Sequence, residues 1–506
     1  MSSLRGRRLV SRNRKIIITF ALLLSNAMAG LDGTIINTAL PAIVSDLHGI
    51  QYMGWIVAIF LLGMAVATPL WSKFGERKGN KCAYITATTV FAVGALFQGL
   101  ASNITWFIIA RGIMGLGAGG MSTIPFIIYA QLFENLKRRA QVIGITSASF
   151  STASIIGPLF GGWIVDTFSW HWVFYVNLPL ALVSVGIVAL FFKSTRERNQ
   201  QPVDYQGSVL MVLGLVAILT GIQLLGTQPL GWTVGLVVVG VGLLGWMHRV
   251  ENRVTDPIVP NRLFRNSKLV IDLIIFAVLW GAFVAFNIYV PMWAQGIMGL
   301  SALIGGMTQI PGSIANFIGS ELAPAVQPKI GRYGVLAMGT LTFLVTFIGM
   351  SWVAQTASYT FLLVMGAFNG FGIGVCFTTL QVAVQSDVAT NDVPIATSFA
   401  YLVRILSQTF MSSIYGVVLS KALAAGVQAN HGRITMGMLN KLTNSQTASG
   451  LPAKLLPAMR TILYQGMHNI MVLALVLVLV IVVLISTLLI RQHRAARTMK
   501  RQRNAA

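Results

Sequence analysis

Five ionisable side chains stand inside long apolar stretches of this sequence. Asp32, Asp272 and Glu321 are the acids of this kind, and Arg111 and Arg404 are the cations. A buried charge is costly unless it is paired and hydrogen-bonded. An acid held between apolar surroundings and a nearby cation can take up and release a proton. Asp32, Arg111, Glu321 and Asp272 are therefore candidates for proton coupling, with purely structural ion pairing as the alternative.

The elements that carry these residues are apolar and long. The chain has 506 residues, of which 55% are hydrophobic and 10% charged, with a mean hydropathy of +0.75. Soluble proteins have roughly 25% charged residues. Apolar runs of about 20 residues, enough for a helix to cross a bilayer, recur along the chain. We predict an all-α membrane protein with fourteen transmembrane helices at 16–38, 52–72, 82–102, 104–129, 141–165, 170–192, 206–226, 231–248, 269–293, 302–326, 334–354, 358–384, 395–420 and 467–490.

The net charge of +23 is unevenly placed. Of the 36 Lys and Arg residues, 29 lie in the two tails and in the connections that follow even-numbered spans, whereas the short connections on the other side have none. This is the positive-inside pattern, which predicts a multi-pass protein of the cell membrane with both termini in the cytoplasm. The charge is thus an orientation signal and gives no support to nucleic-acid binding. Two cysteines provide neither a disulfide framework nor a metal site, and no metal or cofactor is expected.

The order of spans predicts three parts. Residues 1–192 would form a six-helix bundle, 193–268 a linker with two additional helices, and 269–506 a second six-helix bundle with a long extracellular loop at about 421–466. The basic turns FGERKGNK (74–81) and QPKIGRYG (327–334) occupy matching places in the two bundles and indicate a pseudo-repeat. Repeated halves are the usual architecture of alternating-access transporters.

Depth along the helices relates the first two charges. Asp32 lies roughly 24 Å from the start of its span, and Arg111 roughly 10 Å from the opposite face, at 1.5 Å per residue. The two depths agree within about a turn, so we expect the side chains to face each other. Asp272 and Glu321 both lie nearer the cytoplasm, and Asp272 is expected to pair at the interface with the basic segment 262–268. Residues expected to line a substrate cavity are Asn37, Phe286, Asn287, Tyr289 and Asn316.

The turn of residues 72–81 joins the second and third spans. Glu76, Arg77, Gly79 and Lys81 could form a charge network that holds two helix ends together and breaks on inward opening. A purely topogenic basic loop is the alternative. The turn resembles the signature loop of the major facilitator superfamily, in which Glu76 takes the place of an Asp; Ser72 and Asn80 depart from the pattern.

Two further stretches resemble motifs of the same superfamily. Arg111 followed by the glycines of residues 115–120 is similar to its fourth-helix motif, although the glycines could serve simple packing. In the fifth span, Pro158 bends the helix, and small residues allow close approach of a neighbour. That stretch resembles the antiporter signature and comprises Gly157, Pro158, Gly161 and Gly162.

With residues 31–41, the aromatic string 169–179 and the span count, these motifs resemble the fourteen-span drug:proton antiporter family of the superfamily. The resemblance implies a monomer that exports amphipathic, cationic drugs in exchange for protons across the lipid bilayer. Alternatives are the same fold dedicated to one physiological metabolite, lipid or fatty acid, and a membrane sensor that does not transport. An enzyme is disfavoured, because the six histidines are scattered and no nucleophile–base pair is evident.

Overall fold

The computed structural model describes residues 11–133, 136–193, 205–225, 228–251, 265–389 and 393–505. Within this part of the chain the long elements are all helices, which confirms the predicted all-α class. The first group comprises α1 (Arg12–Asp46), η1 (Ile50–Tyr52), α2 (Met53–Lys78), α3 (Asn80–Gly99), α4 (Ile104–Leu132), α5 (Leu136–Thr167), α6 (His171–Tyr175) and α7 (Asn177–Phe191). Next come α8 (Tyr205–Gln223) and α9 (Leu230–Glu251). The last group comprises α11 (Ser267–Met292), η2 (Trp293–Ile297), α12 (Ala302–Met307), α13 (Ile310–Trp352), α14 (Tyr359–Ser386), α15 (Val393–Ala429), α16 (Met436–Leu442), α17 (Ser445–Ala448) and α18 (Leu456–Ala505).

Eleven segments of the described residues are long and apolar enough to cross a membrane. One of them, Ala302–Trp352, is 51 residues long and includes Gly331, whose φ of 75° and ψ of 168° are not helical. Such a φ suits glycine, which has no Cβ to clash. The predicted ranges 302–326 and 334–354 lie on either side of this break. The count of fourteen spans itself stays a prediction.

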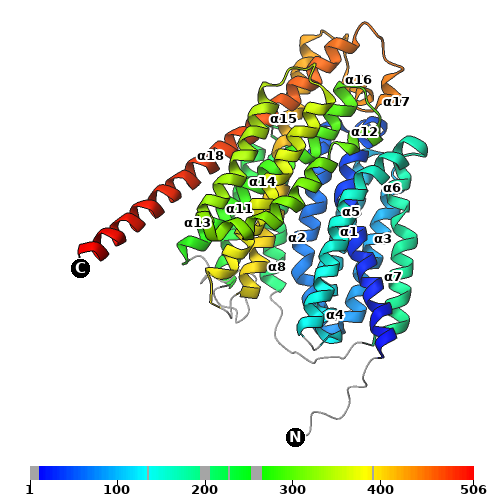
Figure 1. Cartoon of the computed structure of the whole chain (residues 1–506). Coiled ribbons are helices and arrows are strands. Elements are labelled where there is room, and N and C mark those ends of the chain that lie inside the picture. The colour runs from blue at the N-terminus through cyan, green and yellow to red at the C-terminus, as the bar shows by residue number, and fades with distance from the viewer. Residues whose placement is uncertain are drawn as a thin grey trace.

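The long helices run side by side as two groups, α1–α7 and α11–α18, with α18 projecting at the C-terminus (Figure 1). We call the end of the molecule at which α1 finishes the distal end, and the end at which α1 begins the proximal end. The short helices α12, α16 and α17 gather at the distal end (Figure 1). Within the predicted linker region 193–268, residues 194–204 and 252–264 lie outside the described part of the structure.

Helix α8 packs against both groups, and α9 packs on α8. Leu215 and Leu219 of α8 join one apolar cluster with Leu62 of α2, and Leu406 and Phe410 of α15 pack against the same cluster. Of the two additional helices, α8 therefore contacts a helix from each half of the molecule.

Helices α2 and α15, which lie beneath the α8–α9 hairpin, cross each other closely. A Cβ placed on Gly54 of α2 would lie 2.8 Å from the Cα of Gly416 on α15. Glycine at both positions allows the two backbones to touch, as small residues do at membrane helix crossings. The first and last groups are thus in direct contact along α2 and α15.

The connection predicted at about 421–466 is partly helical. Helix α15 continues to Ala429, and α18 begins at Leu456, so the connection is shorter and contains α16 and α17. Hydropathy marks where a helix leaves the apolar layer, and a helix can continue past that point in water. This explains why the helices extend beyond the predicted spans.

Candidate proton-coupling site and substrate pocket

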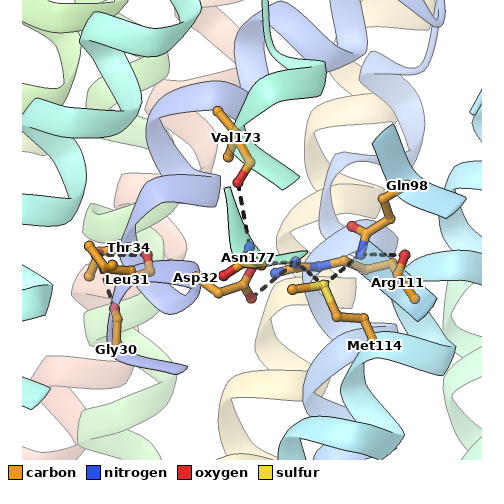
Figure 2. A network of polar contacts seen from close by, with 10 residues as sticks. Gly30, Leu31, Asp32, Thr34, Gln98, Arg111, Met114, Val173 and Asn177 are labelled. Atoms are coloured by element: carbon orange, nitrogen blue, oxygen red, sulfur yellow. Dashed lines mark hydrogen bonds and ion pairs between the residues drawn. The ribbon is translucent and has the colours of Figure 1, made fainter. Parts of the chain in front are cut away.

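Asp32 and Arg111 form a buried ion pair between α1 and α4 (Figure 2). The Arg111 Nη1 donates to Asp32 Oδ1 at 3.2 Å and to Oδ2 at 3.1 Å. Each residue is 1% exposed. The predicted meeting of these two side chains is therefore correct in geometry.

The guanidinium of Arg111 is only partly satisfied by this pair. A two-nitrogen fork is the strongest arginine–carboxylate geometry, whereas here a single nitrogen makes both bonds. The Nε is buried and has no hydrogen-bond partner. Phe60 of α2 supports the charge instead, with its ring centre 4.1 Å from Arg111 Cζ, within the range of a cation–π contact. The carboxylate is thus held by one nitrogen.

A second polar side chain lies beside the pair. Gln98 of α3 is fully buried, and its amide nitrogen lies 2.7 Å from the sulfur of Met114, which itself lies 3.8 Å from Arg111 Nη1 (Figure 2). Gln98 Oε1 is buried without a partner. Sequence reasoning missed Gln98 as a site residue, because one amide in an apolar span has no recognisable spacing.

The glycines of α4 place Arg111 next to its neighbours. A Cβ on Gly115 would lie 3.0 Å from the Cα of Phe60, and one on Gly119 would lie 2.7 Å from the Met64 carbonyl oxygen. Both contacts belong to α2 and are tighter than a side chain allows. The glycines therefore serve the close approach of α2 that brings Phe60 over the guanidinium.

The residues of the antiporter signature pack α5 against two other helices. A Cβ on Gly161 would lie 2.8 Å from Ile35 Cγ1 of α1, and one on Gly157 would meet the hydroxyl of Thr34. A Cβ on Gly162 would lie 2.7 Å from the backbone nitrogen of Leu303 in α12. Helix α12 returns the contact, because Gly306 packs on the backbone of Pro158. Helix α5 thus lies between the helix that carries Asp32 and the second half.

Asp272 belongs to a different charge cluster. Its carboxylate is fully buried and pairs with Arg332, which also binds Asp387 Oδ2 at 2.7 Å. Within the described residues this cation comes from α13, just after the break at Gly331, and not from the expected segment 262–268, of which residues 262–264 lie outside the described part. The basic turn 327–334, which matches the turn 74–81, contains Arg332. The contact of this side chain with Asp272 on α11 depends on the break at Gly331.

Glu321 lies on α13 with an exposed side chain. The structure therefore places it on the surface of the chain, and none of its hydrogen bonds or ion pairs within the described residues joins it to Asp32 or Asp272. Depth in a helix, which singled out this residue, does not say which way it faces. Its role in proton coupling remains a prediction.

Three residues predicted for a substrate cavity meet at one pocket. Phe286 and Asn287 of α11 and Asn316 of α13 line it, and its empty volume is about 300 Å³, including the part open to solvent. The other lining residues are Phe283, Thr308, Gln309, Gly312, Ser313, Gly366, Asn369 and Gly370. Two buried polar atoms of the pocket, Gln309 Nε2 and Asn369 Oδ1, have no hydrogen-bond partner. They can donate to and accept from a bound molecule.

The other two predicted cavity residues lie elsewhere. Tyr289 is fully buried and packs edge-on against Tyr415, with ring centres 6.3 Å apart, and its hydroxyl has no partner. Asn37, on α1, is 9% exposed. Neither residue lines the pocket.

The predicted gate turn bonds within the first group of helices. Lys81 Nζ donates to the Ala189 carbonyl near the C-terminus of α7, at 2.5 Å, where a cation is favoured. Gly79 joins α2 to α3 with a φ of 94°. Arg77 is exposed, and the side chain of Glu76 lies outside the described part of the structure.

Hydrogen bonds join the two halves at the distal end, and sequence reasoning missed them. Gln295 Nε2 donates to the Thr38 carbonyl at 3.1 Å, and Thr443 Oγ1 donates to the Pro41 carbonyl at 2.8 Å. The carboxylate of Asp166 accepts from the backbone nitrogens of Ala302 at 3.1 Å and Leu303 at 2.8 Å. These contacts depend on backbone atoms, which leave no pattern in a sequence. We call this set the distal contacts.

In the part of the chain that the structure describes, eleven long apolar segments, a buried charge pair and a polar pocket define a multi-pass membrane transporter. Residues 22–412 match the Major Facilitator Superfamily, and the chain belongs to that superfamily.

Two relatives from Bacillus subtilis (strain 168) carry drug-related names. The chain is 27% identical to the multidrug transporter protein MdtP over 91% of its own length and 90% of that protein, and 27% identical to multidrug resistance protein 3 over 79% of each. Its fold is similar to a bacterial homolog of the human lysosomal transporter Spinster, with a TM-score of 0.63, 16% identity and coverage of 95% and 98%. The relatives of this transporter thus include multidrug proteins.

Proposed function

We propose that the protein is a proton-coupled antiporter of the cell membrane that exports amphipathic compounds by alternating access. The observation that carries the proposal is the Asp32–Arg111 pair, a carboxylate with 1% exposure held by a single guanidinium nitrogen. An ionisable pair inside a membrane segment is a functional-site candidate by default. The drug-related names of the two Bacillus relatives support export of foreign compounds.

The order of residues along α1 supports a link between this pair and the distal contacts. Thr38 lies six residues after Asp32, roughly 9 Å along the same helix. The carbonyls of Thr38 and Pro41 hold Gln295 and Thr443 of the second half. A proton on Asp32 cancels its charge and weakens its bond to Arg111, which frees α1 to move. Movement of α1 relative to α11–α18 would then break the distal contacts.

In this proposal the proximal end faces the cytoplasm, as the placement of basic residues predicts. With the distal contacts formed, the pocket on α11, α13 and α14 would receive its substrate from the cytoplasmic side. A proton that reaches Asp32 from outside would accompany outward release. The groups 1–192 and 269–506 act as the two moving bundles, and residues 193–268 add α8 and α9.

The test is transport by purified protein in proteoliposomes with an imposed pH gradient. Asp32→Asn should abolish transport driven by the gradient while substrate exchange at equal pH persists, because exchange requires no net proton movement. Asp32→Glu keeps a titratable carboxyl and should retain part of the driven transport. Unchanged gradient-driven transport by the Asn variant would show that Asp32 does not carry the proton.

A further inference from the structure

Arg404 of α15 lies among aromatic rings inside the second half. Its Cζ is 4.4 Å from the ring centre of Tyr401, 4.9 Å from that of Trp280 and 5.9 Å from that of Phe377. These distances are in the range of cation–π contacts. Trp280 belongs to α11 and Phe377 to α14, so rings from three helices surround the guanidinium. We call this set the Arg404 cradle.

The cradle lacks an anion. Two other arginines described above are paired, Arg111 with Asp32 and Arg332 with Asp272 and Asp387. For Arg404, the described residues provide neither an ion pair nor a hydrogen bond, and its Nε is buried without a partner. The indole nitrogen of Trp280 is also buried without a partner. A guanidinium and an indole have only donors to offer, so the group that would satisfy them both is an acceptor.

The depth of the cradle distinguishes a bound molecule from a lipid headgroup. Arg404 lies eleven residues into α15 and Trp280 thirteen residues into α11, roughly 17 and 20 Å from the helix starts. Lipid phosphates lie at the edges of the roughly 30 Å apolar layer. An anion at this depth is therefore part of a molecule that enters the protein.

The cradle touches the wall of the polar pocket. The rings of Trp280 and Phe283 meet edge to face with centres 5.1 Å apart, and Phe283 lines the pocket. Asn287 follows Phe283 after one helical turn and lines the same pocket. The lining includes the free Gln309 donor and the free Asn369 acceptor, and among the described residues it contains no acidic side chain. A cationic substrate would find no carboxylate there.

We propose that the Arg404 cradle binds the anionic group, a carboxylate or sulfonate, of an amphipathic substrate whose apolar and amide portions occupy the adjoining pocket. This inference rests on the proposed function for the direction of transport, and it replaces the cationic class that the family resemblance implies. The binding itself does not require proton coupling.

Fluorescence titration of the purified full-length protein tests this assignment with two matched probes, dansylglycine and its uncharged amide. The wild type should bind the anion about tenfold more tightly or better. Arg404→Gln should remove that preference. Arg433 is exposed and lies outside the cradle, at the distal end. Arg433→Gln loses the same charge and should keep the preference for the anion.

A second variant keeps the charge in place. Tyr401→Glu puts a carboxylate one turn before Arg404, where it can form an intrahelical pair and occupy the guanidinium. It should also remove the preference for the anion, even if Arg404→Gln fails to fold. Equal affinities in the wild type, a preference that survives in Tyr401→Glu or in folded Arg404→Gln, or a loss in Arg433→Gln would each overturn the proposal. Because binding is measured at equilibrium, failure of proton-driven transport would not affect this result.

Discussion

The hydroxyl of Thr443 donates to the carbonyl oxygen of Pro41 at 2.8 Å and thereby joins the segment between α16 and α17 to the helix that carries Asp32. Pro41 lies nine residues after Asp32 on α1. The bond therefore connects the second half to the same rigid element as the buried charge pair. Any change that moves α1 along or about its axis must also act on this bond.

Cross-linking across the distal contacts should stop transport. The hydroxyls of Ser45 and Thr447 lie 2.8 Å apart on the two halves, close enough for cysteines at these positions to form a disulfide with modest adjustment. In a background without Cys82 and Cys376, the Ser45→Cys/Thr447→Cys variant should lose transport on oxidation and regain it on reduction. Each single cysteine variant is the control. Full activity of the cross-linked protein would show that the halves need not separate at this end.

Loss of the Asp166 carboxylate should weaken the distal contacts. It accepts two backbone hydrogen bonds from α12, and hydrogen bonds to charged groups contribute about 1.5–3 kcal/mol each. Asp166→Ala should therefore increase, by about tenfold or more, the rate at which a cysteine in place of Thr38 is labelled. Thr38 is buried, and its side chain makes no hydrogen bond. A membrane-impermeant maleimide applied from the distal side measures this rate. An unchanged rate would mean that this carboxylate does not hold the end closed.

Removing one partner from the Asp272 cluster should destabilise the protein. Arg332→Gln leaves a fully buried carboxylate without its cation, which costs about 3–5 kcal/mol for a broken buried pair. The double variant Arg332→Gln/Asp272→Asn removes both charges and should recover much of the loss. Thermal unfolding in detergent measures both. Equal melting temperatures for the wild type and Arg332→Gln would contradict a structural role for the cluster.

Membrane voltage should distinguish the charge of the substrate. When one proton enters for each monovalent anion that leaves, two positive charges move inward, and a potential of 100 mV contributes about 4.6 kcal/mol. Exchange of one proton for a monovalent cation moves no net charge and should not respond to voltage. Transport of dansylglycine in proteoliposomes with imposed potassium diffusion potentials should thus accelerate with an inside-negative voltage in cell-like orientation. A voltage-independent rate for the anion would exclude this stoichiometry.

The Asp32–Arg111 contact could be predicted because helical rise is regular. Counting residues from the ends of two spans gives their depths, and both residues are on long continuous helices. Glu321 shows the limit of the same reasoning. Rise fixes the position along the axis but not the direction of the side chain, and this one is exposed.

The partner of Asp272 could not be predicted, for a different reason. Proximity in sequence favoured the segment 262–268 as its partner, whereas the true partner is sixty residues away and is positioned by the positive φ of Gly331. The distal contacts could not be predicted at all, since backbone carbonyls and amides act there with side chains of common types. For the Arg404 cradle, one signal is visible in the sequence, a cation inside a predicted span. The rings come from three helices, so their meeting could not be predicted.

The α8–α9 hairpin gives the transporter two unequal flanks toward the lipid. On one flank it lies over α2 and α15, whose glycines Gly54 and Gly416 touch. The described chain has a single inserted hairpin of this kind, which covers the seam between α2 and α15. The opposite seam between the halves has no such hairpin among the described residues. A compound dissolved in the bilayer would accordingly have to pass the hairpin to reach the seam between α2 and α15.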